Sequence, residues 1–239
     1  AQVEGNGTQR EELVEPLTNY LVARAQKDFN DKNSYIGGIF TATNRNLNGR
    51  FNNLHKAAYT GGLDFRHTWK NRTYFVEGNV VFSTVTGSKE AIEKTQRSLT
   101  HLFQRVDAGH VRVDPNRTSL SGTGGKLSAG KSGGGNWRYG GDVNWRSPEL
   151  ELNDVGFLRQ ADEISQDVHV RYQFLKPTNF FRRANIRLNQ SSTYDFDGNY
   201  NRFQVDGSIS VNWKNNWWTK TGLGYKPRTF INTFLRGGP

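Results

Sequence analysis

The chain has 239 residues, a formal net charge of +10 and a sequence pI near 9.9, but its basic residues are interleaved with carboxylates, unlike a compact nucleic-acid-binding patch. A hydrophobic fraction of 34% is low for a soluble core of this size, whereas 6 Trp, 9 Tyr and 15 Phe exclude a disordered chain. The lack of cysteine excludes disulfides, thiolate metal sites and a cysteine nucleophile, and the lack of an apolar run of about 18 residues excludes a transmembrane helix.

About ten predicted strands make up most of the chain, because apolar and polar residues alternate in them with a period of two. In chain order the predicted strands are 17–29, 34–44, 59–70, 74–83, 123–132, 137–146, 164–174, 181–193, 203–214 and 217–228. Strands in soluble proteins usually have about 5–6 residues, whereas crossing the hydrocarbon of a bilayer takes about 9–11. We therefore predict an all-β chain that forms a transmembrane antiparallel β-barrel.

The stretch GKLSAGKS, residues 125–132, matches the phosphate-binding pattern G-x-x-x-x-G-K-[S/T]. Such a loop needs a buried strand before it and a helix after it, so that backbone N–H groups surround the phosphates. The residues before it are polar and glycine-rich, and the glycines at 133–135 each disfavour a helix by about 1 kcal/mol. The sequence therefore predicts a strand and its turn here, without a nucleotide site.

The predicted connections alternate in length. Short turns are expected at 30–33, 71–72, 133–135, 176–179 and 215–216, and longer polar links at 45–56, 87–122, 148–162 and 194–201. Outer-membrane barrels have short turns at the periplasm and long loops outside. We predict that 1–239 is a single β-barrel region in which 87–122 is a long extracellular loop insertion. Because the first and last strands both meet the long-loop side, we expect an incomplete arc of a larger barrel.

Aromatic residues cluster beside the predicted short turns. In a membrane barrel, aromatic residues gather at the membrane–water interface, so this position predicts a girdle. A soluble aromatic core, or a surface that stacks on sugars or bases, gives no reason for a correlation with turn length. The predicted girdle consists of Trp69, Tyr74, Trp137, Tyr139, Phe174, Trp213, Trp217 and Trp218.

The residues that alternate with the apolar set are expected to face the barrel lumen. They serve either as a charged pore lining that selects solutes, favouring anions, or as cross-strand salt bridges that brace the lumen. The lumen-lining candidates are Asp64, Arg66, Glu77, Arg138, Asp142, Arg146, Asp167, His169, Arg171, Arg187 and Asp206.

The long links contain few residues in patterns typical of a catalytic or metal site. Asp107, His110 and Asp114 lie close together in sequence, but without a metal-ligand spacing or a nucleophile, so we predict no catalytic residue, metal or cofactor. The segment 88–105 has the apolar spacing of a short amphipathic helix, although its second half also suits an extended strand. SPELELNDVGF, 147–157, has apolar residues in a predicted loop, which either folds on itself or tucks into the lumen.

Several separated motifs resemble the C-terminal barrel region of a family of large Bacteroidetes-type outer-membrane proteins of unassigned function. The motifs are SPELELNDVGFLRQADE, EPLTNYLVARAQKDFN, SYIGGIFTATNRNL, HKAAYTGGLDF, GSKEAI and LRGGP. In that family the barrel follows an N-terminal domain similar to family 9 carbohydrate-binding modules. The resemblance covers nearly the whole chain and implies a barrel fold and a location in the bacterial outer membrane.

Three functions are consistent with these patterns. The first is an outer-membrane channel or transport-associated barrel, and the second is an occluded barrel that anchors or scaffolds a partner complex. The third is a soluble β-rich glycan-binding protein. No acid, base and nucleophile converge, so we do not expect an enzyme. The expected partners are outer-membrane lipid and a protein at the extracellular loops or the periplasmic side, with no nucleic acid; the solute is left unspecified.

Overall fold

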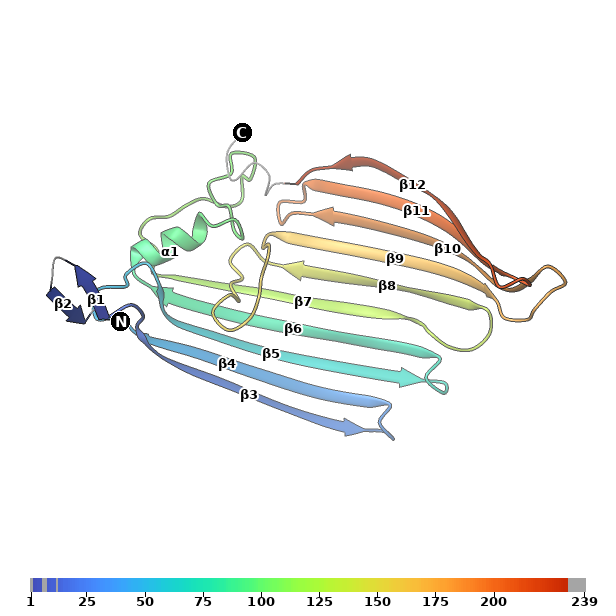
Figure 1. Ribbon diagram of the computed structural model, residues 1–239, viewed down its shortest axis with the longest axis horizontal. Coiled ribbons are helices and arrows are strands. Elements are labelled where there is room, and N and C mark those ends of the chain that lie inside the picture. Colours follow the sequence, from blue (N-terminus) through green and yellow to red (C-terminus); the bar gives the residue numbers. More distant parts are fainter. Residues whose placement is uncertain (1, 6–7, 12, 232–239) are drawn as a thin grey trace.

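The computed structural model describes residues 2–5, 8–11 and 13–231, and its main element is one antiparallel sheet of ten strands (Figure 1). Each strand pairs with the strands next to it in sequence. The strands are β3 Leu17–Phe29, β4 Ser34–Asn46, β5 His55–Trp69, β6 Tyr74–Gly87, β7 Ser119–Lys131, β8 Trp137–Arg146, β9 Glu163–Phe174, β10 Phe181–Tyr194, β11 Tyr200–Trp213 and β12 Trp218–Thr229. A separate hairpin joins β1 Gln2–Gly5 to β2 Thr8–Glu11.

The all-β antiparallel class and the ten long strands are confirmed, but the sheet is not closed into a barrel. In the described part of the chain, β3 and β12 are the two edge strands, and each pairs on one side only. Nearly every residue of β3 and all residues of β12 are exposed. A meander brings neighbouring strands together through local hairpins, whereas closure requires a pairing between its first and last strands.

The connections are sorted as predicted, with one exception. Short turns at 30–33, 70–73, 132–136, 175–180 and 214–217 lie at one end of the sheet, and the long connections 47–54, 88–118 and 147–162 lie at the other (Figure 1). The predicted long link at 194–201 is a tight turn, 195–199, because Asp195 Oδ1 accepts hydrogen bonds from the backbone N–H groups of Asp197 (3.1 Å) and Asn199 (2.8 Å). We call the two ends of the sheet the turn end and the loop end.

The pattern GKLSAGKS lies in β7 and the turn that follows it, so the predicted strand and turn are confirmed. A Cβ on Gly125 would lie 2.4 Å from the Trp145 ring of β8. This glycine is therefore needed for close packing against an aromatic ring within the sheet.

The sheet has one face of apolar side chains that no other part of the described chain covers. Cross-strand pairs share a face, and the register places large, exposed apolar residues from all ten strands on this side. We call it the apolar face. Examples are Leu21, Ile36, Leu63, Phe82, Leu127, Val143, Val168, Ile186, Ile209 and Leu223.

The helix α1, Lys89–Gln96, lies in the connection between β6 and β7. It begins at Ser88, whose side-chain oxygen accepts a hydrogen bond from the backbone N–H of Ala91 (3.1 Å). The short helix expected within 88–105 is therefore confirmed, but only over its first half; residues 97–105 form turns, in which Leu102 has a φ of 53°. Among the described residues, no helix has the length and apolar character needed to cross a membrane.

Candidate functional site: the polar face and its loops

The eleven residues predicted to line a lumen all lie on the face opposite to the apolar face. Pairing across β5 and β6 sets Arg66 opposite Glu77, and pairing across β8 and β9 sets Asp142 opposite Asp167. The other candidates follow from the alternation along each strand. We call this side the polar face; the sequence alternation placed its residues correctly, while their function stays a prediction.

Across the middle of the polar face, opposite charges pair. Arg24 Nη2 lies 3.2 Å from Asp64 Oδ2, and Arg66 Nε lies 3.6 Å from Glu77 Oε2. Lys126 Nζ lies 3.7 Å from Asp142 Oδ1, and Arg146 pairs with Glu163. These partly exposed pairs stabilise the sheet by at most about 1 kcal/mol each. Four members of these pairs, Arg24, Asp64, Glu77 and Lys126, help to line a hollow of about 450 Å³.

Nearer the turn end, three arginines lie directly opposite one another on adjacent strands. Arg138 of β8 pairs in register with Arg171 of β9, which pairs with Arg187 of β10. In the next row, His169 lies opposite Asn189, which donates a hydrogen bond from Nδ2 to Asp206 Oδ2 (2.7 Å). Like charges directly opposite one another destabilise a sheet. The row of three arginines is therefore less favourable for folding than rows in which opposite charges pair.

At the loop end, the 88–118 connection folds back over the polar face. Ala58, Val85 and Leu120 form one apolar row across β5, β6 and β7. Ile92 of α1 and Phe103 pack against this row in a buried cluster. The loop predicted to be an extracellular insertion over 87–122 is therefore shorter, since β7 begins at Ser119, and much of it lies against the sheet.

The 147–162 connection packs beside it on the same face. Leu150 is 1% exposed and contacts Leu158, Ala161 and Val81. A Cβ on Gly122 would lie only 2.2 Å from the backbone N of Leu150, so the absence of a side chain at Gly122 permits this approach. The segment therefore packs both on itself and on the polar face, while its position in a lumen stays a prediction.

His101 joins the two long loops. Its Nε2 lies 2.9 Å from Glu151 Oε2, and its Nδ1 lies 2.7 Å from the carbonyl oxygen of Pro148. Burial opposes ionisation of Glu151, but the hydrogen bonds from His101 and from the backbone N–H of Asn153 (2.6 Å) outweigh it and lower the pKa of Glu151. The carboxylate is thus stabilised in its charged form.

A second histidine–carboxylate pair attaches the 147–162 loop to the strand ends. His55 Nδ1 lies 2.8 Å from Asp154 Oδ2, and Arg45 Nη1 lies 2.5 Å from Asp154 Oδ1. Burial of Asp154 favours its neutral form, yet His55 and Arg45 together lower the pKa of this carboxyl. The other ring nitrogen of His55 lies 2.7 Å from Thr95 Oγ1 on α1, beside a hollow of about 330 Å³.

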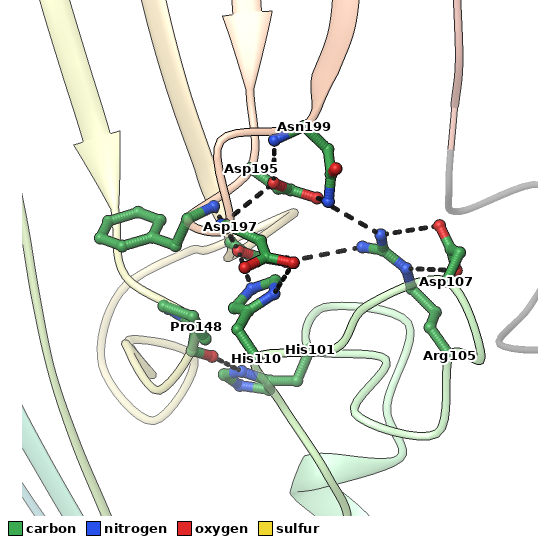
Figure 2. A network of polar contacts seen from close by, with 10 residues as sticks. His101, Arg105, Asp107, His110, Pro148, Asp195, Asp197 and Asn199 are labelled. Carbon is green, nitrogen blue, oxygen red and sulfur yellow. Dashed lines mark hydrogen bonds and ion pairs between the residues drawn. The ribbon is translucent and has the colours of Figure 1, made fainter.

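A third group of charged residues connects both long loops to the 195–199 turn (Figure 2). His110 Nε2 lies 2.9 Å from Asp162 Oδ1. Arg105, which is nearly fully buried, lies between Asp107 (3.0 Å), Asp162 (3.5 Å) and Asp195 (3.9 Å). These contacts fix three separate segments to one another at the loop end.

Asp107, His110 and Asp114, which are close in sequence in the longest loop, contact different partners. Asp107 accepts hydrogen bonds from Arg105, which lower its pKa, whereas the Asp114 backbone N–H donates to Gln96 Oε1 (2.8 Å). Among the residues that the structure describes, no three His, Cys, Asp or Glu side chains are grouped to hold a metal ion.

Most of the predicted aromatic girdle lies on the apolar face at the turn end. The residues placed there are Trp69, Tyr74, Trp137, Tyr139, Phe174 and Trp213, and rings of neighbouring strands contact one another, as in the Trp69–Tyr74 pair with centroids 5.7 Å apart. Trp217 lies in the 214–217 turn. Trp218 pairs with Asn212 and is therefore on the polar face, contrary to its predicted position. Successive side chains along a strand alternate between the two faces, and the register of Trp218 with Asn212 sets Trp218 on the polar face.

The residues that bind the loops to the sheet were missed in the sequence. His101 and Glu151 are 50 positions apart, and no spacing motif connects them. The sequence feature that pointed to this packing was the presence of apolar residues such as Leu150 and Leu152 in a predicted loop.

The comparisons with known proteins give a family without an assigned activity. One family model, described as a domain of unknown function (DUF5916), matches residues 1–235. No curated protein matches the chain. Function has to be inferred from the polar face, the apolar face and the loops.

Proposed function

The chain belongs to the DUF5916 family, and we propose that it forms an arc of an outer-membrane β-barrel that acts as a channel or transport-associated protein. The observation that carries this proposal is the uncovered apolar face, which extends over all ten strands. Soluble monomers rarely expose contiguous apolar patches larger than a few hundred Å². Lipid would cover this face at no cost, while the polar face would line the interior.

Strand length and the open edges support the same proposal. The ten strands have between 10 and 15 residues, and about 9–11 are enough to cross the hydrocarbon when a strand is tilted. Within residues 13–231, the outer edges of β3 and β12 have no strand partner, and backbone groups cannot remain unpaired in lipid. Further strands would complete the barrel. The motifs in the sequence, and not the fold, suggest a Bacteroidetes-type outer membrane and a neighbouring domain similar to family 9 carbohydrate-binding modules.

The second candidate is an occluded barrel that anchors or scaffolds a partner complex. The packing of 88–118 and 147–162 on the polar face favours it, because both loops would lie within the barrel at one end. In this case the loop end would be the surface for a protein partner. In both candidates the lipid contacts and the orientation of the sheet are the same.

Paired cysteine variants test the orientation, since the chain has no cysteine of its own. Ser208→Cys is on the polar face and Ile209→Cys is on the apolar face of the same strand. In lipid vesicles, we expect a water-soluble maleimide to label position 208, and a nitroxide attached to lipid chains to quench a fluorophore at position 209 only. Equal labelling of both positions by the maleimide, in a protein that stays soluble without detergent, would instead support the soluble glycan-binding alternative.

Electrical recording separates the two membrane candidates. The full-length protein is extracted from membranes, its folded barrel is identified by a gel shift on boiling, and it is then inserted into planar bilayers. Discrete conductance steps support the channel. A gel shift with a silent bilayer supports the occluded barrel.

A further inference from the structure

We propose that Arg138, Arg171 and Arg187 form an anion-binding site on the polar face, and that its ligand carries a phosphate group. The three residues are direct neighbours across β8, β9 and β10. Opposed residues in an antiparallel pair have Cα atoms about 4.5–5.5 Å apart. The three side chains therefore start from adjacent positions on the same face of the sheet.

These three arginines have no carboxylate partner among the described residues, unlike Arg24, Arg66 and Arg146 on the same face. Within the described part of the chain, no ion pair involves any of the three. Arg138 Nη1 donates to the backbone carbonyl oxygens of Gly134 (3.2 Å), Gly135 (2.9 Å) and Trp137 (2.9 Å). The Nε atom of Arg171 is buried and has no hydrogen-bond acceptor among the described residues.

A buried donor without an acceptor and three like charges in one row are both unfavourable in the free protein. A bound anion would relieve both, because it would accept hydrogen bonds from the guanidinium groups and neutralise part of their charge. Asp206 lies in the next row and accepts hydrogen bonds from Asn189 (2.7 Å) and Gln204 (3.3 Å), and it forms no ion pair with the three arginines among the described residues.

The surroundings fit an oxyanion with several acceptor atoms. The planar fork of arginine binds phosphate or carboxylate oxygens in pairs. Ser208 lies opposite Arg187, and Gln173 lies opposite Asn185 in the next row towards the turns, so neutral donors surround the cationic row. The loops pack at the other end of the sheet and leave this area open. Three arginines favour a multiply charged phosphate group over a single carboxylate.

The site does not depend on an open channel, because it needs only a polar face that water reaches. Binding of inorganic phosphate to the full-length protein in detergent micelles, measured by calorimetry at low ionic strength, is therefore independent of the conductance experiment. We expect saturable binding by the wild type and a loss of about 10-fold or more in affinity for Arg171→Gln.

Two variants make the test specific. Arg66→Gln removes the same charge from the same face but from a paired arginine, and it should bind phosphate within about 2-fold of the wild type. Arg171→Lys, which keeps the charge and removes the fork, should have an intermediate affinity. A correctly folded wild type that binds neither inorganic phosphate nor phospholipid vesicles overturns the proposal, as does an equal loss in Arg66→Gln and Arg171→Gln. Binding to phospholipid vesicles without binding of inorganic phosphate would assign the phosphate group to a lipid headgroup.

Discussion

At the loop end of the polar face, charged side chains such as His101, Glu151 and Arg105 are buried and form ion pairs. At the turn end the arginine row is half-buried and has no carboxylate partner among the residues that the structure describes. The difference follows from what covers each end. Loops that pack on a sheet remove water from the groups beneath them, so any charge left there needs a partner within the protein. Where no loop packs, water or a ligand can solvate the charge.

The two ends of the sheet therefore differ in what stabilises them. The loop end is held together by apolar packing around Leu150 and Ile92 and by the histidine–carboxylate pairs. The two long loops do not pack on the turn end, and it is there that we propose an anion binds. The predictions below test this contrast, beginning with the largest expected effect.

Leu150→Ala should release the 147–162 loop from the sheet. It removes a side chain that is 1% exposed, and truncation of a buried leucine costs about 2–5 kcal/mol. Amide hydrogen exchange of residues 147–162 measures the free energy of opening of this loop. Phe157→Ala, in the same loop at 81% exposure, is the control and should change it by less than about 0.5 kcal/mol. Equal effects of the two variants would show that the loop is not anchored at Leu150.

His101→Ala should weaken the contact between the two long loops. It leaves the Glu151 carboxylate buried without its side-chain partner, which costs about 1–3 kcal/mol. Exchange in both loops, 88–118 and 147–162, should rise together. Arg97→Ala removes the exposed pair with Glu93 and should cost at most about 0.5 kcal/mol. If only one loop responds to His101→Ala, the two loops are not joined through this residue.

Acidification should also open the 147–162 loop, but by less than His101→Ala does, because a protonated carboxyl keeps part of its hydrogen bonding. The folded pKa values of Glu151 and Asp154 lie below their ordinary values of 4.5 and 3.8. Their stabilising contribution is therefore complete above the ordinary values and is lost as the pH falls through the lower, folded values. Exchange rates corrected for intrinsic pH dependence should show this loss below about pH 4.

The double variant Glu151→Gln, Asp154→Asn provides the control for this pH dependence. Its loop should already be more open at neutral pH and should lack the acid transition. A transition that persists in the double variant would assign the pH dependence to other groups.

Arg187→Gln should have the smallest effect on stability. It removes one of three opposed like charges, so the free energy of unfolding in urea should stay within about 0.5 kcal/mol of the wild type or increase. Arg66→Gln, which breaks the pair with Glu77, should lower it by up to about 1 kcal/mol. A clear loss of stability in Arg187→Gln would mean that the arginine row has a structural role.

Local patterns predicted the sheet well. The alternation in 203–214 corresponds to β11, and the asparagine-rich turn at 30–33 follows from the left-handed conformation that Asn30 adopts with a φ of 54°. A long link was predicted at 194–201, but the connection is a tight turn, 195–199, because the Asp195 side chain accepts hydrogen bonds from the backbone of the turn. The wrong face for Trp218 arose from treating two adjacent tryptophans as one cluster.

By itself, the sequence determined the strands, their order and the residues of each face, because alternation and turn residues act over a few neighbouring positions. Only the tertiary structure decided that two long loops fold back over the polar face, and that the arginine row stays free of carboxylates. These features depend on partners far away in the chain, such as His101 with Glu151, and on register between strands. Such pairings follow from the packing of whole segments, which leaves no periodic signal in the sequence.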